Sequence, residues 1–334
     1  MTASVSTNPG EFRNSNTPAV SVIIPAYNTA KYIAVTLRSA LSQTFTNFEV
    51  IVINDGSPDS NDLEIAIQPF LERITYLKQE NRGPGSARNL GIKQARGQFV
   101  AFLDSDDVWL TEYLHKQMEL FEGTPSLDMV YSDALLCALD GSSRKTYMET
   151  CPSSSPVTFE SLLVEDSQVI TSGTVARRRA IVEAGLFDES RDLVGSEDYD
   201  LWLRVAYHGG VIGFQRQVLL KHLVRPNSLS SDGVRILENI IKVLTKVERS
   251  LELSSERIAL LRNKLAQTEA QLALERGKQY LLLGELDKAG ASLLKANEFV
   301  KNPKLSAVLL GLRIVPRLTV FGVRCWDRFL ALSN

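Results

Sequence analysis

Acidic residues crowd at the end of one short apolar run. The run Phe99–Leu103 is followed at once by Asp104, Asp106 and Asp107. Carboxylates this close repel one another unless a positive group lies between them. Mg²⁺ and Mn²⁺ prefer oxygen ligands and are often held by one or two carboxylates together with substrate phosphates. Asp104 and Asp106 therefore predict a metal-bound nucleotide. The alternative is that an aspartate here begins a helix, and Asp107 is the candidate for that.

Two further segments carry residue types that suit the same ligand. Asp55, in N-D-G-S, is placed either to accept hydrogen bonds from a ligand or to form a simple Asx turn. In N-R-G-P-G-S-A-R-N, residues 81–89, the glycines let the backbone approach a ligand closely, while Arg82 and Arg88 supply positive charge. That combination suits a diphosphate, and the alternative is a surface loop that caps a helix.

A helix start near residue 196 carries the last acidic cluster. In G-S-E-D-Y-D-L-W-L-R, Ser196 is the expected N-cap, and Glu197 and Asp198 follow in the first turn. Such acids either complement the helix dipole or, if aimed at a site, serve as a general base. The apolar positions predict the buried face, at Leu201, Trp202 and Val205.

Strand and helix patterns alternate ahead of these clusters. The predicted strands are 20–25, 49–54, 74–78 and 97–103, and the predicted helices are 29–43, 63–73 and 84–95. This alternation is typical of a mostly parallel sheet buried on both faces, whose ligand lies beyond the carboxyl ends of the strands. The polar ends of three strands should therefore gather at one edge, at Pro25–Asn28, Asn54–Ser57 and Asp104–Asp107.

The pattern changes along the chain and predicts three regions. Residues 1–19 are polar and predict a disordered tail, 20–232 predict an α/β domain, and 233–334 predict a helical region. Within the last region, spacing fits one tetratricopeptide repeat at Gly277, Tyr280, Gly284, Ala289, Leu293 and Ala296. A single repeat cannot bury its own face, so a helical hairpin packed on the α/β domain is the favoured interpretation over a partner-binding repeat.

Composition limits the partners and the cellular location to be expected. The net charge of −2 gives no reason to expect nucleic acid binding, and three scattered cysteines predict neither a disulfide framework nor a zinc site. No signal peptide or membrane span is predicted, which favours the cytoplasm. Residues 301–334 are basic, apolar and contain Trp326. They suit either peripheral contact with the inner face of the cell membrane or a packed tail with a solvated basic face.

Taken in order, these segments resemble family 2 glycosyltransferases of the GT-A fold over about residues 20–232. The resemblance rests on V-S-V-I-I-P-A-Y-N, I-V-I-N-D-G-S, N-R-G-P-G-S-A-R-N-L-G-I, F-L-D-S-D-D and S-E-D-Y-D-L-W-L-R. It implies a GT-A Rossmann-like α/β fold, mostly parallel and flanked by helices, with an α-helical C-terminal extension. It also implies inverting transfer of one sugar from a nucleotide-diphospho-sugar, most simply a UDP-sugar, to a hydroxyl of a saccharide or lipid-linked acceptor. Cell-surface polysaccharide or glycolipid synthesis is the expected setting.

On the donor side, the resemblance implies roles by position. The first strand end lies against the nucleotide base, at Pro25, Ala26, Tyr27 and Asn28. Asp55 reads the edge of the base. Arg82 and Arg88 are expected near the diphosphate, where positive charge stabilises the leaving group.

For metal binding and catalysis, the resemblance implies a second set. Asp104, with Ser105, contacts the nucleotide, while Asp106 together with Asp104 binds Mn²⁺ or Mg²⁺. Asp198 is the general base for the acceptor hydroxyl, and Glu197 beside it is a helper or an acceptor contact.

Two departures from the family pattern affect these expectations. Arg225 stands about where many relatives carry a histidine that can bind the metal, so we expect Arg225 to contact phosphate instead. His222 lies three residues earlier and, on a strand, would face the opposite side. The Q-x-x-R-W signature of processive relatives is missing, which favours addition of a single sugar.

Two other functions remain as alternatives. A nucleotidyltransferase would also need a nucleotide and a metal, but it would usually carry a glycine-rich loop after the first strand, where P-A-Y-N stands here. A non-catalytic scaffold would bind nucleotide-sugars and use the helical tail for partners. The intact Asp55, Asp106 and Asp198 argue against the scaffold.

Overall fold

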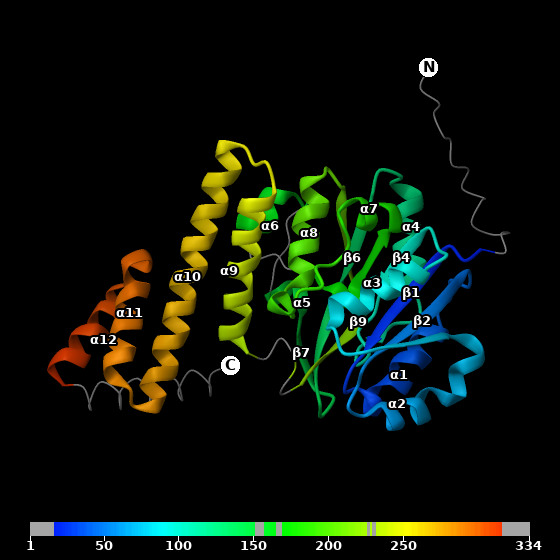
Figure 1. Cartoon of the computed structure of the whole chain (residues 1–334), viewed down its shortest axis with the longest axis horizontal. Helices are drawn as coiled ribbons and strands as arrows, with labels where there is room; N and C mark the ends of the chain where they lie inside the picture. The colour runs from blue at the N-terminus through cyan, green and yellow to red at the C-terminus, as the bar shows by residue number, and fades with distance from the viewer. Residues whose placement is uncertain (1–16, 151–156, 165–168, 226–227, 229–231, 316–334) are drawn as a thin grey trace, which may run out of the picture. The chain divides into compact units, whose positions relative to one another are not determined.

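The computed structural model describes residues 17–150, 157–164, 169–225, 228 and 232–315 (Figure 1). The chain divides into two compact units, with the first ending at Ser228 and the second beginning at residue 229. Most of the predicted N-terminal tail, and the part of the basic segment beyond residue 315, lie outside the described residues. Each unit is considered by itself below.

The first unit begins with a parallel half-sheet that covers the predicted α/β pattern. Its strands lie in the order β3-β2-β1-β4 and are β1 (Val20–Ala26), β2 (Phe48–Asp55), β3 (Thr75–Gln79) and β4 (Phe99–Phe102). The helices between them are α1 (Ala30–Leu41), α2 (Ser60–Ile67) and α3 (Pro84–Gln94). The prediction of one helix over 63–73 is wrong, because the chain tightens into a 3₁₀ segment, η2 (Gln68–Arg73), at Pro69, which has no backbone N–H to donate.

The other half of the sheet mixes strand directions. The order continues from β4 through β8 (Thr174–Arg177), β6 (Met129–Ala138), β9 (Ile212–Val224) and β5 (Val108–Trp109), and β7 (Ser143–Thr146) pairs with β6. β8 runs antiparallel to β4 and β6, whereas β6 and β9 run parallel to each other. The helical segments are α4 (Tyr113–Gly123), α5 (Tyr147–Thr150), α6 (Phe159–Val164), η3 (Thr171–Gly173), α7 (Arg178–Glu183), η4 (Arg191–Leu193) and α8 (Glu197–Tyr207).

Close packing fixes the two helices that carry the candidate site. On α3, a Cβ added to Gly91 would lie 2.6 Å from Cγ2 of Ile23, so glycine lets this helix lie directly on β1. On α8, Trp202 packs against Phe102 of β4 and Phe187, with ring centroids 6.2 and 5.9 Å apart. The predicted inward face of α8 is confirmed, since Leu201, Trp202 and Val205 are buried.

Over the described residues 232–315, the second unit contains four helices: α9 (Gly233–Ser250), α10 (Ser255–Leu283), α11 (Leu286–Val300) and α12 (Pro303–Ile314). Ser254 caps α10 by accepting a hydrogen bond from the Arg257 amide, and Gly284 ends it in the left-handed conformation at φ +80°. A Cβ added to Gly277 would lie 2.5 Å from Cδ2 of Leu293. A small residue of the repeat-like spacing on α10, Gly277, therefore packs directly against a large one on α11, Leu293.

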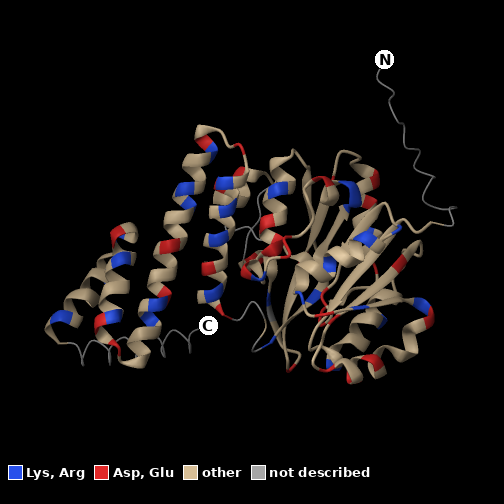
Figure 2. Cartoon of the chain, in the orientation of Figure 1, with Lys and Arg blue, Asp and Glu red and all other residues tan. Residues whose placement is uncertain are grey.

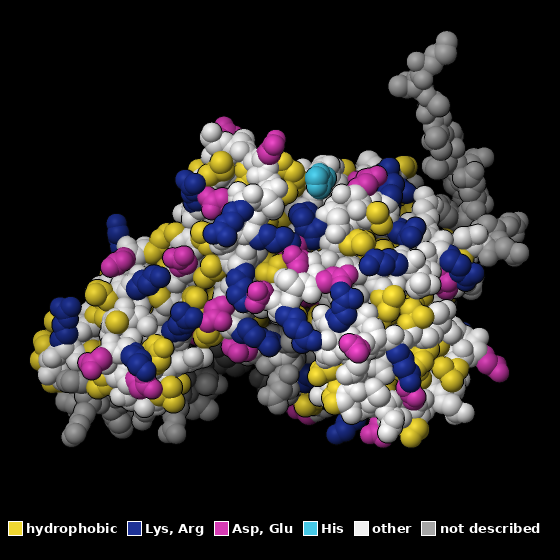
Figure 3. All heavy atoms as spheres, in the orientation of Figure 1, with side chains coloured by type: hydrophobic (Ala, Val, Ile, Leu, Met, Phe, Trp, Pro, Cys, Tyr) yellow, Lys and Arg dark blue, Asp and Glu magenta, His cyan; other side chains and the backbone are white. Residues whose placement is uncertain are grey.

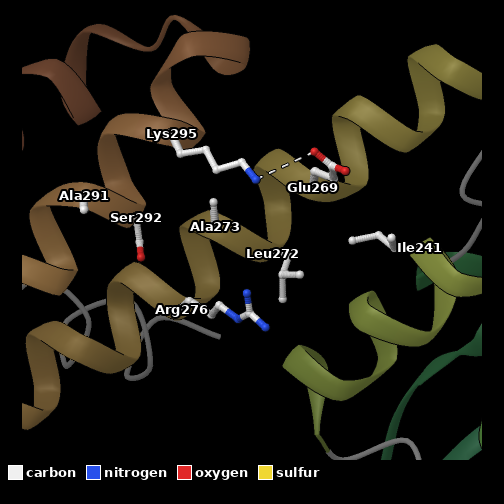
Figure 4. A pocket seen from close by; sticks show the side chains of 8 residues that line it. All are labelled: Ile241, Glu269, Leu272, Ala273, Arg276, Ala291, Ser292 and Lys295. Atoms are coloured by element: carbon white, nitrogen blue, oxygen red, sulfur yellow. Dashed lines mark ion pairs between the residues drawn. The ribbon is translucent and has the colours of Figure 1, made fainter. Parts of the chain in front are cut away.

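A groove of about 370 Å³ lies within this unit, between α9, α10 and α11 (Figure 4). It is lined by Ile241, Glu269, Leu272, Ala273, Arg276, Ala291, Ser292 and Lys295. Both of its cations have acidic partners: Arg276 lies 2.6 Å from Glu238, and Lys295 lies 3.8 Å from Glu269. The groove therefore presents balanced charge to any occupant.

The surface mixes the two signs of charge. Acidic and basic residues are both spread along α10 and α11 in Figure 2, and side chains of both signs are interspersed on the face drawn in Figure 3. Among the described residues, no helix is both long enough and apolar enough to cross a membrane.

Candidate active site

Three polar strand ends meet at one edge of the sheet, as the sequence predicts. The ends of β1 and β2 are joined by a 2.7 Å hydrogen bond from the Asn28 amide to Oγ of Ser57. The turn after β4 is joined to the turn after β1 by a 2.9 Å bond between the hydroxyls of Ser105 and Thr29. Tyr27 stays 48% exposed beside them, so its ring is open to a ligand.

Asp55 organises the loop that follows β3. Its Oδ1 accepts hydrogen bonds from the Arg82 amide at 2.9 Å and from Gln79 at 2.7 Å, and its Oδ2 accepts from the Gly83 amide at 2.8 Å. The local Asx turn of N-D-G-S is made instead by Asn54, which accepts from the Ser57 amide at 2.9 Å. Asp55 therefore holds the glycine-containing loop at the same edge as Tyr27.

The two arginines of the segment 81–89 lie in different environments. Arg82 is exposed and pairs with Glu189 at 2.6 Å. Arg88 is buried on α3 and forms two 2.7 Å contacts, one with Oδ1 of Asp104 and one with Oε1 of Glu197. Burial alone would lower the pKa of Arg88, but the two carboxylates outweigh it and raise that pKa, so the guanidinium stays charged.

We expect Arg88→Met to lower the free energy of unfolding by about 3–5 kcal/mol. The substitution keeps most of the apolar stem but leaves the buried Glu197 and the partly exposed Asp104 without their shared cation. Breaking the buried pair with Glu197 from one side carries that cost. Urea unfolding of both proteins measures it. Arg82→Met is the matched control and should change stability by less than about 1 kcal/mol, because the Arg82 side chain is 61% exposed. Equal losses in the two variants would contradict the bridging role.

The acid cluster after β4 faces the residues that follow β9. Arg225 donates through Nε to Oδ2 of Asp106 at 2.6 Å and lies 5.3 Å from the Tyr32 ring. Burial, with Asp107 and Asp104 close by, raises the pKa of Asp106 to about 6, although Arg225 opposes the shift. Burial thus disfavours the ionised form of Asp106 even with an arginine in contact.

Asp107 does not begin a helix, so that prediction is wrong. It precedes β5, and α4 starts only at Tyr113. The side chain is fully buried because it accepts from Nδ1 of His222 and from the Leu223 amide, both at 2.9 Å. Burial would lower the pKa of His222, but the Asp107 carboxylate outweighs it and raises that pKa to about 9.

His222 and Arg225 both reach the acid cluster, through Asp107 and Asp106 respectively. The two side chains were expected to face opposite sides of a strand. That expectation does not apply, because β9 ends at Val224 and Arg225 lies beyond the strand. The histidine is tied to the acid next to the predicted metal pair, and the arginine is tied to one member of that pair.

The N-terminus of α8 holds the other two predicted acids. Glu197 is buried between Arg88 and the Gly195 amide, which donates to its Oε2 at 2.6 Å. Asp198 is only half-buried, and its Oδ2 accepts from the Thr171 hydroxyl at 2.6 Å. Asp198 is therefore the more open of the two carboxylates. Ser196 lies at the N-cap position, as predicted, but its hydroxyl donates to the Gly195 carbonyl instead of accepting from the helix.

Several residues that build this site were not predicted from the sequence. Thr171 and Ser172 lie in η3, between Asp198 and the Asp104 amide, which donates to Oγ of Ser172 at 3.1 Å. Glu189 receives hydrogen bonds from Arg82, Ser86 and Asn89. The run V-I-T-S-G-T around Thr171 carries a turn signal, Ser-Gly, within an otherwise apolar stretch, but nothing in it points to an acid far along the chain.

Asp104 and Asp106 fit a divalent cation that arrives together with phosphates. Each pairs with an arginine through one oxygen and keeps its other oxygen outside those contacts. No group of three or more His, Cys, Asp or Glu side chains among the described residues is arranged to hold a metal by itself. Two carboxylates completed by substrate oxygens are an ordinary Mg²⁺ or Mn²⁺ environment.

The mixed sheet flanked by helices is a fold of the GT-A type, and comparisons with solved structures agree. A solved structure of TarS from S. aureus in complex with UDP aligns with a TM-score of 0.57 at 21% identity, over 94% of this chain and 92% of that one. A mannosyltransferase from Pyrobaculum calidifontis, solved with GDP-Man and Mn²⁺, aligns with a TM-score of 0.57 at 19% identity, over 94% and 88% of the two chains.

Sequence comparison gives the family. The family described as "Glycosyl transferase family 2" matches residues 21–137. A putative teichuronic acid biosynthesis glycosyltransferase, TuaG of Bacillus subtilis, is 31% identical over 70% of this chain and 89% of its own length. The chain belongs to glycosyltransferase family 2.

Proposed function

We propose that the protein transfers a single sugar from a nucleotide-diphospho-sugar, of the UDP-sugar class, to an acceptor hydroxyl with inversion at the anomeric carbon. The observation that carries this proposal is the double contact of Arg88, which joins Asp104 at the nucleotide edge to the helix that bears Asp198. A donor held at the strand ends would thus lie beside a half-buried carboxylate suited to activate an acceptor. The name of TuaG supports a role in cell-surface polysaccharide synthesis, and the UDP complex of TarS supports a UDP-sugar as the donor.

On the donor side, Tyr27 would stack on the nucleotide base, next to the loop that Asp55 holds in place. Asp104 and Ser105 would face the ribose and diphosphate. Of the three predicted arginines, Arg82 and Arg225 are the ones exposed enough to approach the phosphates, with side chains 61% and 22% exposed. Arg88, at 6%, would act by holding Asp104.

On the acceptor side, the Asp198 carboxylate would accept the proton of the acceptor hydroxyl. The acceptor oxygen forms its bond to the anomeric carbon as the bond from that carbon to the diphosphate oxygen breaks, and the electron pair leaves with the diphosphate. The acceptor oxygen would attack the anomeric carbon from the side of Asp198, opposite the departing diphosphate. A single displacement of this kind inverts the configuration at that carbon. Glu197, buried against Arg88, would keep Asp198 and Asp104 in fixed relation.

Asp104 and Asp106 would hold a Mn²⁺ or Mg²⁺ ion, which when bound neutralises charge that develops on the departing diphosphate. The mannosyltransferase solved with GDP-Man and Mn²⁺ supports a metal of this kind. Arg225 contacts Asp106 through one hydrogen bond, and it would turn toward the phosphates once a cation occupies that carboxylate.

A thermal-stability panel tests the donor class. We expect a UDP-sugar with Mn²⁺ to raise the melting temperature more than GDP-Man or either component alone, because a ligand at 100 times its Kd adds about 2.7 kcal/mol to the stability of the folded state. UDP-GlcNAc and GDP-Man, each with Mn²⁺, Mg²⁺ or EDTA, are the first probes. A larger shift with GDP-Man would move the donor to the GDP class, and no shift with any nucleotide-sugar would sink the proposed function.

A further inference from the structure

We infer that Thr171 is the residue that orients the Asp198 carboxylate for proton transfer. The inference rests on the proposed function, which makes Asp198 the general base. The Thr171 hydroxyl donates to Oδ2 of Asp198 at 2.6 Å, a short bond of the charge-assisted kind. On the other oxygen, Oδ1 accepts from the adjacent Tyr199 amide at 2.8 Å. Each carboxylate oxygen is thereby directed by one donor and keeps a further lone-pair direction for an acceptor proton.

The position of Thr171 is itself fixed by buried contacts along η3. The indole of Trp109 donates to the Ser172 carbonyl at 2.8 Å, and Gln117 donates to the Gly173 carbonyl at 3.1 Å. Both donors are buried, and Trp109 also stacks on Tyr113 with ring centroids 4.0 Å apart. A Cβ on Gly173 would lie 2.8 Å from Leu220, so the turn has no room to shift in that direction. The hydroxyl is therefore presented from a rigid support.

The same turn also holds the donor side of the site. Ser172, the next residue, accepts the Asp104 amide through its hydroxyl at 3.1 Å. Two adjacent side chains thus serve the two sides of the proposed reaction. Thr171 contacts the base, Asp198, and Ser172 contacts Asp104 at the nucleotide edge. Because both act from one turn, η3 sets the position of the Asp198 carboxylate relative to the bound donor. A misplacement of about 1 Å in such a pair can cost about 100-fold in rate.

The decisive variants are Thr171→Val, which keeps the shape and removes the donor, and Thr171→Ser, which keeps the donor. The assay is release of UDP from the UDP-sugar that the stability panel selects, with water as acceptor. We expect Thr171→Val to lower kcat by about 10-fold or more with little change in the donor KM. Thr171→Ser should restore kcat to near the parent value, because it returns the hydroxyl donor to Oδ2 of Asp198.

Controls separate this inference from the proposed function. Asp198→Asn is measured in parallel. If it stays active, the base assignment fails. If it is inactive while Thr171→Val matches the parent in kcat, only the role of Thr171 fails. UDP binding to Thr171→Val by calorimetry should stay within about 2-fold of the parent, whereas a purely structural defect would weaken it. If Thr171→Val does not fold, Thr171→Ala replaces it, because alanine removes the same donor without filling the site. The results expected for Thr171→Val then apply to Thr171→Ala.

Discussion

Replacing Asp198 with asparagine is expected to abolish sugar transfer while leaving nucleotide binding at the parent level. Asparagine has nearly the same shape and still accepts a hydrogen bond from Thr171, but it cannot accept the proton of an acceptor hydroxyl. Loss of a general base typically costs about 100–10,000-fold. UDP release from the selected UDP-sugar measures transfer to water, and calorimetry with UDP and Mn²⁺ measures binding.

The matched control for this experiment is Asp62→Asn. Asp62 also lies in the first turn of a helix, α2, and is exposed, so the same chemical change is made away from the site. It should retain parent activity. If Asp198→Asn releases UDP at the parent rate, Asp198 is not the base, and the inverting mechanism loses its proton acceptor.

Replacing Asp106 with alanine is expected to remove the dependence of UDP binding on Mn²⁺. Changing even a residue that only supports a metal ligand typically costs about 10–100-fold in metal affinity, so loss of a ligand should cost at least as much. The affinity for UDP in EDTA should fall little, because the substitution also frees Arg225 to contact phosphate. Calorimetric titration of UDP, with and without Mn²⁺, separates the two effects.

The size of the Mn²⁺ effect is the decisive quantity for Asp106→Ala. Asp62→Ala should keep the parent ratio between the affinities with and without Mn²⁺, since that side chain is exposed on α2. An unchanged ratio in Asp106→Ala would place the cation elsewhere. A ratio near one in the parent protein itself would instead indicate that Arg225 supplies the positive charge at Asp106 without a metal.

The sequence predicted the parallel half of the sheet closely, and the physical reason is local. β-branched runs such as V-S-V-I-I-P specify buried strands by themselves, so the predicted β1, β2 and β3 end within a residue or two of the observed ones. The gathering of Asp55 and Asp104 at one edge followed from parallel strand direction alone. These inferences needed no knowledge of contacts between distant segments.

What the sequence could not predict depends on such distant contacts. Arg88 was expected near phosphate, but it lies between acids 16 and 109 residues away in the chain. Asp107 was assigned to a helix start because aspartate favours that position, yet its carboxylate is taken by His222 and Leu223 from β9. Tertiary pairing overrides local preference in both cases, and only the folded arrangement reveals it.

The bridge formed by Arg88 has a consequence for how this protein can diverge. Asp104 and Glu197 share one buried cation, so replacing either acid alone still leaves Arg88 paired with the other. Replacing both acids leaves a buried guanidinium without a partner, so the double replacement should cost more than the sum of the single ones. The three positions form an epistatic unit: once one acid is lost, Arg88 depends on the other alone.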